Sequence, residues 1–157
     1  MSTAALGKKV PAFSAPATGG THFQSREAVK AGQSLVVYFY PKDNTGGCTK
    51  EGAAFGELHG QFVKAGAVVV GVSPDSLASH EKFKAKYAFP FALLSDEDQS
   101  LCRLFDVWKE KSMYGKKYMG VERSTFLIDD QGVLRQEWRK VKVDGHAAEV
   151  LAALKAL

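Results

Sequence analysis

The stretch LVVYFYPKDNTGGCTKE, residues 35–51, decides the fold. Its β-favouring residues form a strand that ends at Pro41, because proline has no N–H to give to a sheet. Turn-prone residues then lead to Cys48, after which Phe55, Leu58 and Phe62 recur with helical spacing. We therefore expect Cys48 where a loop becomes the first turn of a helix.

The predicted position of Cys48 favours chemical reactivity. Unpaired backbone N–H groups and the positive end of the helix dipole meet at a helix N-terminus. Both stabilise a thiolate, which is the reactive form of cysteine. The alternative is a small buried cysteine used for packing. Because Gly46, Gly47 and Thr49 are poor material for a tight core, we interpret Cys48 as a nucleophile.

The residues around Cys48 resemble those of the peroxiredoxins, and most closely the Q-type, or bacterioferritin-comigratory, branch. The family pattern Pro-x-x-x-Thr-x-x-Cys is matched by Pro41, Thr45 and Cys48. A second family block, Glu-Arg-Ser-Thr-Phe-Leu-Ile-Asp, is found at residues 122–129 and supplies Arg123. The resemblance extends from Val10 to the C-terminus. It implies a thioredoxin-like fold and the thiol-dependent reduction of hydrogen peroxide and organic hydroperoxides.

Four residues are candidates for the catalytic site. Cys48 attacks the peroxide and becomes a sulfenic acid. Complete ionisation of a free cysteine accelerates attack only about 30-fold at pH 7, so hydrogen-bond donors must stabilise the departing oxygen. Thr45 and Arg123 are the expected donors, and Pro41 is expected to shield the thiolate from water.

Each of these assignments has a simpler alternative. Thr45 can bond its own loop, Pro41 can merely end a strand, and Arg123 can be an exposed strand charge. Taken together at the family's spacing, the catalytic interpretation is favoured. Glu51, one helical turn after Cys48, is placed to orient Arg123, although an acidic residue near a helix start is favourable whatever its function.

Two versions of the catalytic cycle remain open. Many Q-type members carry a resolving cysteine five residues after the first, where this chain has Ala53, and others carry it in the next helix, where the nearest match is Lys84. Either Cys48 works alone and thioredoxin, glutaredoxin or a small thiol reduces its sulfenic acid, or Cys102 resolves it after local unfolding. We favour the one-cysteine cycle, because Cys102 lies in an apolar helical pattern. A noncatalytic redox sensor or chaperone is the alternative from another class of function.

Composition sets further limits. The 157 residues, with 45% apolar and 24% charged, fit one domain spanning 1–157. Two cysteines are too few for a disulfide framework. No apolar run is long enough to span a bilayer, and the N-terminus lacks the hydrophobic region of a secretory signal. We therefore expect a cytoplasmic protein with no membrane partner, and a monomer.

The net charge of +4 does not indicate a nucleic-acid partner. The basic residues are scattered except for a patch at Lys109, Lys111, Lys116 and Lys117, and no nucleic-acid-reading motif surrounds this patch. We expect a solvated loop there, which could attract an acidic protein partner over long range.

No cofactor or metal is expected. The four histidines are dispersed, and no pair of His or Cys residues has metal-ligand spacing. We interpret the histidines as surface or core residues. The glycines before Cys48 lack the order of a phosphate-binding loop, which argues against nucleotide binding.

The pattern of segments predicts an α/β fold: a central mixed β-sheet flanked by helices, with an N-terminal β-hairpin. The expected strands span residues 10–14, 21–24, 35–40, 67–72, 91–94, 124–128 and 133–138. The expected helices span residues 48–65, 73–87, 95–105 and 145–157.

Overall fold

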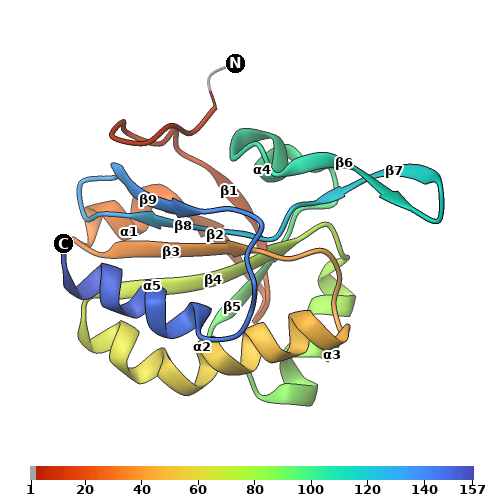
Figure 1. The fold of residues 1–157 in the computed structure, drawn as a ribbon. Coiled ribbons are helices and arrows are strands. Elements are labelled where there is room, and N and C mark those ends of the chain that lie inside the picture. Colours follow the sequence, from red (N-terminus) through yellow and green to blue (C-terminus); the bar gives the residue numbers. More distant parts are fainter. Residues whose placement is uncertain (1–2) are drawn as a thin grey trace.

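The computed structural model describes residues 3–157 and has a seven-stranded mixed sheet with helices on both faces (Figure 1). Its strands are β1 Ser14–Ala17, β2 Thr21–Gln24, β3 Ser34–Phe39, β4 Ala67–Ser73, β5 Ala92–Ser95, β6 Trp108–Met113, β7 Lys116–Val121, β8 Ser124–Ile128 and β9 Leu134–Trp138. Its helices are α1 Ser25–Lys30, α2 Gly46–Lys64, α3 Leu77–Tyr87, α4 Ser100–Leu104 and α5 His146–Lys155. The predicted mixed sheet with flanking helices and an N-terminal hairpin is confirmed.

The strand order of the large sheet is β2-β1-β5-β4-β3-β8-β9. Strands β3, β4 and β5 run parallel, whereas β8 pairs antiparallel to β3. All six residues of β3 are buried, as expected of a central strand covered on both faces. The loop after β3 therefore starts from a rigid position in the middle of the sheet.

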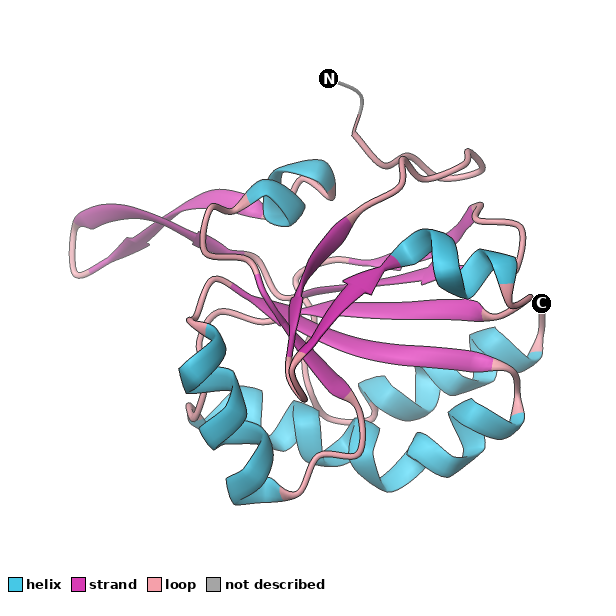
Figure 2. Ribbon diagram, turned by 180° about the vertical axis from the view of Figure 1, so that it is seen from behind, coloured by secondary structure: helices cyan, strands magenta, loops and turns pink. Residues whose placement is uncertain are grey.

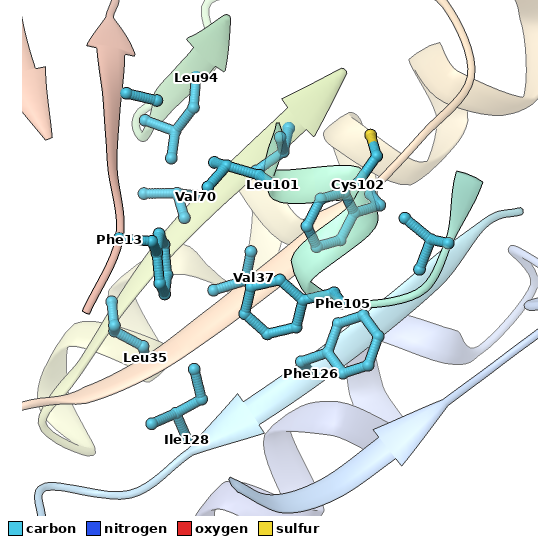
Figure 3. Close-up of a cluster of buried hydrophobic side chains, with 14 of the residues drawn as sticks. Phe13, Leu35, Val37, Val70, Leu94, Leu101, Cys102, Phe105, Phe126 and Ile128 are labelled. Carbon is cyan, nitrogen blue, oxygen red and sulfur yellow. The ribbon is translucent and has the colours of Figure 1, made fainter. Parts of the chain in front are cut away.

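Two apolar clusters cover the two faces of this sheet. Successive residues of β3 alternate between them, with Val37 and Phe39 in one cluster and Val36 and Tyr38 in the other. The first cluster, which contains Cys102, is drawn in Figure 3. Cys48 belongs to the second cluster, under α2 and α5. The two cysteines therefore lie on opposite faces of the sheet.

Helices α2, α3 and α5 lie together below the sheet, while α1 and α4 lie on its other side (Figures 1 and 2). Among residues 3–157, none of the helices combines the length and the apolar character needed to cross a bilayer.

Several elements differ from the prediction. Helices α3 and α4 begin at Leu77 and Ser100, later than the predicted residues 73 and 95. The first arm of the N-terminal hairpin is Ser14–Ala17, because residues 10–13 lead into the sheet before pairing begins. The short helix α1 was not predicted, since six residues carry too little periodicity. Helix α2 begins at Gly46, two residues earlier than expected, which places Cys48 inside its first turn.

The predicted loop around the lysine patch is wrong. Residues 108–121 form an antiparallel β-hairpin, β6–β7, which pairs as a separate two-stranded sheet. Tyr114 and Gly115 both have positive φ, as a two-residue hairpin turn with the right twist requires. The prediction failed because most side chains of this hairpin are polar or exposed, so no buried face leaves a strand pattern in the sequence.

Candidate active site

Cys48 is the third residue of α2 and lies directly beyond the C-terminal end of β3. Its residue exposure is only 2%, so the sulfur is covered on most sides. The last residue before the helix is Thr45, whose carbonyl accepts the first helical hydrogen bond, from the Thr49 N–H at 2.9 Å. The sulfur is thus held in the first helical turn, where backbone N–H groups have no partner within the helix.

Arg123 reaches Cys48 from a distant part of the chain. It lies in the two-residue connection between β7 and β8, and its Nη2 donates to the Cys48 Sγ at 3.3 Å. Only 17% of the Arg123 side chain is exposed. A Cβ on Gly47 would lie 3.2 Å from Nη2, so the glycine leaves the guanidinium room. The alternative of an exposed strand charge is therefore wrong.

Glu51 fixes the orientation of Arg123. Its Oε1 accepts from Arg123 Nη1 at 2.6 Å, while its side chain is 1% exposed. Because Glu51 lies three residues after Cys48, one helix presents both the sulfur and the carboxylate to the same guanidinium. A charge-assisted pair of this kind is short and directional, so Arg123 has little freedom to turn away from the sulfur.

Arg123 and Glu51 influence each other's pKa. Burial raises the pKa of Glu51 to about 7, although Arg123 opposes this shift. Burial lowers the pKa of Arg123, but the charges of Glu51 and Cys48 outweigh burial, so its pKa lies above its ordinary value. The guanidinium therefore remains positive beside the buried Glu51 carboxyl.

The other two predicted residues lie in the loop between β3 and α2. The Thr45 hydroxyl donates to the Lys42 carbonyl at 3.0 Å, which is the local bond considered above as the alternative. Pro41 is partly buried two residues after the end of β3. Their roles toward a peroxide stay predictions.

A polar network under this loop was missed by the sequence prediction. The Asp43 carboxylate accepts from the Tyr40 hydroxyl at 2.7 Å and from the Ser79 hydroxyl at 2.7 Å, and its Oδ2 lies 2.7 Å from His80 Nδ1. The Asp43 N–H donates to Asp75 Oδ2 at 2.8 Å. The network ties the loop between β3 and α2, which leads to Cys48, to α3 and to the end of β4.

One signal for this network was present in the sequence. Asp43 and Asp75 each follow a strand of the parallel pair β3–β4, and the ends of parallel strands meet at one edge of a sheet. His80, interpreted as a surface or core histidine, is fully buried and also lies 2.8 Å from the Leu94 carbonyl. His80 is therefore a core residue whose two ring nitrogens lie within hydrogen-bond distance of Asp43 and of the Leu94 carbonyl.

The same residues bear on the prediction that no metal is bound. Asp43, Asp75 and His80 bring one ligand atom each within 4.8 Å of one another, which single spacings in the sequence do not reveal. All three side chains already take part in the hydrogen bonds described above. These hydrogen bonds give the cluster a structural role, which is to anchor the loop between β3 and α2.

The geometry of Cys48, Arg123 and Glu51 agrees with a comparison of the chain with known families. The model of the AhpC/TSA family matches residues 6–137. The chain belongs to the AhpC/TSA family.

Relatives within the family are called peroxiredoxins. Peroxiredoxin Bcp of Xanthomonas campestris pv. campestris is 58% identical over 139 residues, which cover 88% of this chain and 86% of that protein. Peroxiredoxin Bcp of Escherichia coli is 39% identical over 154 residues, covering 95% and 94% of the two chains. These relatives confirm the predicted resemblance to the bacterioferritin-comigratory branch.

Solved structures agree with this assignment. Xanthomonas campestris Peroxiredoxin Q has a TM-score of 0.86 and 56% identity, covering 92% of this chain and 90% of that one. A Xylella fastidiosa PrxQ mutant has a TM-score of 0.91 and 45% identity, covering 99% and 98%. A further structure, 56% identical, concerns the alkyl peroxide reduction activity of the Xanthomonas campestris bacterioferritin comigratory protein. The predicted thioredoxin-like fold is confirmed.

Cys102 lies in a different environment from Cys48 in this peroxiredoxin. It is 0% exposed on α4, among the apolar side chains of the first cluster (Figure 3). Its N–H donates to Asp96 Oδ2 at 2.9 Å, and burial followed by the Asp96 charge raises the pKa of its thiol well above the ordinary range. A thiol in this state is a poor nucleophile.

Proposed function

We propose that the chain is a thiol-dependent peroxidase that reduces hydrogen peroxide and organic hydroperoxides with Cys48 as its nucleophile. The observation that carries this proposal is the Arg123 guanidinium, 3.3 Å from the Cys48 sulfur and fixed by the buried Glu51. Family membership and the alkyl peroxide reduction of the Xanthomonas campestris relative support it.

The chemical step transfers one oxygen. The Cys48 thiolate attacks the terminal oxygen of ROOH, a sulfur–oxygen bond forms, and the O–O bond breaks. Cys48 is oxidised to the sulfenic acid, and the leaving oxygen departs as RO⁻, which takes a proton to give the alcohol or water. Negative charge thus moves from the sulfur to the leaving oxygen during the reaction.

Arg123 is positioned for this movement of charge. A guanidinium with several N–H donors can contact the sulfur at the start and the developing RO⁻ in the transition state. Because Glu51 already holds the guanidinium, no reorganisation is needed when charge develops. We assign Thr45 as a further donor after its bond to Lys42 breaks, and Pro41 as a shield against water.

We propose a one-cysteine cycle with an external thiol. Cys102 belongs to the cluster on the opposite face of the sheet from Cys48, and it is buried. A disulfide requires α-carbons within about 7 Å, so α4 would have to leave its cluster in every cycle. Since the site takes Cys48, Glu51 and Arg123 from one chain, we also propose that a monomer is active.

The first test replaces each cysteine with serine. We expect Cys48→Ser to abolish peroxide consumption with a small-thiol reductant, because a hydroxyl is far too weakly acidic to attack. We expect Cys102→Ser to retain turnover, which makes it the matched control. Thermal unfolding followed by circular dichroism checks that both variants fold. Peroxide consumption by Cys48→Ser at the wild-type rate would overturn the catalytic assignment.

A further inference from the structure

The hairpin β6–β7 has two faces of different chemistry. Its register pairs Lys111 with Tyr118 and Met113 with Lys116, and side chains on paired positions share a face. Alternation along both strands then defines one surface, which we call the lysine face. The lysine face consists of Lys109, Lys111, Met113, Lys116 and Tyr118.

Met113, Lys116 and Tyr118 of the lysine face are exposed to solvent, whereas Lys109 and Lys111 are half-buried. Met113 is 56% and Tyr118 is 44% exposed, and Tyr114 in the adjoining turn is 98% exposed. The hairpin projects from the body of the molecule in both views (Figures 1 and 2). Exposed methionine and tyrosine side chains that lie together are typical of surfaces that bind other proteins, because methionine adapts its shape to a partner and tyrosine supplies a large contact area.

The base of the hairpin leads directly to the active site. Strand β7 ends at Val121, only two residues before Arg123. Lys111 is close enough to the site for its charge to interact with Arg123 and with Cys48, and burial lowers its pKa. A protein that binds the lysine face is therefore brought beside the Cys48 sulfur.

The charge of the lysine face selects the kind of partner. Three of its five side chains are lysines and none is a carboxylate. Lys109 pairs with Asp106 at 3.0 Å, so Lys111 and Lys116 carry the charge that the face offers to a partner. The hairpin's carboxylate, Glu110, lies on the opposite face, where Lys117 is 3.6 Å away. A second copy of this chain would bring lysines against lysines on molecules of net charge +4, which is unfavourable. An acidic surface is attracted instead.

We propose that the lysine face is the docking surface for an acidic dithiol protein that reduces the Cys48 sulfenic acid. The inference rests on the proposed function. One thiolate of the partner attacks the Cys48 sulfur, an intermolecular disulfide forms, and hydroxide leaves and takes a proton to become water. The partner's second thiolate then attacks its own disulfide sulfur, so the partner is oxidised and the Cys48 thiolate is restored.

The test reverses one charge on each face of the hairpin. Lys116→Glu changes the lysine face, and Lys117→Glu makes the same change at the next residue, on the opposite face. Lys30→Glu, at the end of α1, controls for net charge alone. Each protein is oxidised with peroxide and then reduced either by a thioredoxin of net negative charge or by dithiothreitol, in separate stopped-flow experiments.

We expect Lys116→Glu to lower the rate constant with the acidic thioredoxin about tenfold at low salt, because charge complementarity governs association. Lys117→Glu and Lys30→Glu should lower it less than about threefold, and added salt should reduce the difference between variants. The rates with dithiothreitol, and the rate of the preceding oxidation by peroxide, should not distinguish the four proteins.

Several results would overturn the proposal. Equal losses in Lys116→Glu and Lys117→Glu would show that only total charge matters. A dimer of the wild type in sedimentation that Lys116→Glu dissociates would show that the lysine face binds a second copy. If the oxidation step occurs normally, these failures concern the docking surface alone. If the wild type is not oxidised by peroxide at all, the proposed function fails first and the docking proposal with it.

Discussion

At the scale of single residues, the catalytic chemistry depends on how one guanidinium is held. Arg123 contacts the sulfur of Cys48 and the carboxylate of Glu51 at the same time. The sequence allows this pairing, because Glu51 lies one helical turn after Cys48, but it leaves open a simpler role for an acidic residue near a helix start. The network around Asp43 was not expected, since it joins three segments whose approach depends on the strand order.

Replacing Arg123 with alanine separates two ways in which the guanidinium can act. We expect Arg123→Ala to slow oxidation of Cys48 by peroxide by more than tenfold even at a pH where the thiolate is fully formed, because a donor to the developing RO⁻ is lost. The measurement is the single-turnover oxidation rate as a function of pH. Arg135→Ala, which breaks an exposed pair with Asp129, serves as the control. Full recovery of the rate at high pH would mean that Arg123 acts only on ionisation.

At the scale of elements, α2 depends on two kinds of glycine. A Cβ at Gly52 would lie 2.5 Å from the Phe89 ring, whereas nothing lies within 4 Å of a Cβ at Gly60. Gly52 therefore permits close packing of the helix that carries Cys48, and Gly60 has no such role.

This difference predicts opposite effects of the same substitution within one helix. We expect Gly52→Ala to lower the free energy of unfolding by about 1–3 kcal/mol, because the aromatic ring must move in a packed core. Gly60→Ala should raise it by about 0.5–1 kcal/mol, since alanine is the better helix former. Urea unfolding of both variants measures the two values. Equal changes of the same sign would contradict the packing around Phe89.

Elements with a buried face were predictable from the sequence, and elements without one were not. The six buried residues of β3 and the helical spacing after Cys48 leave clear patterns, and both elements were found within two residues of their bounds. Strands β6 and β7 bury few side chains, so their lysines suggested a loop. Tyr114 has a positive φ in the turn, and a tyrosine in the sequence does not predict this conformation.

At the scale of the whole molecule, the sheet separates the two cysteines. Cys48 packs with the cluster under α2 and α5, and Cys102 packs with the cluster under α1 and α4. The sequence favours a one-cysteine cycle because Cys102 lies in an apolar pattern and because Ala53 and Lys84 occupy the usual resolving positions. The strand order adds the physical reason, because a whole sheet must be bypassed before the two sulfurs can meet.

The most direct test is mass spectrometry of the wild type after one equivalent of hydrogen peroxide, with dimedone present to trap sulfenic acid. We expect a dimedone adduct on Cys48, an unmodified Cys102 thiol, and no disulfide between them. Cys102→Ser, treated in the same way, should give the same adduct at the same rate. A Cys48–Cys102 disulfide that forms as fast as turnover, together with a Cys102→Ser protein that stalls after one cycle, would contradict the account.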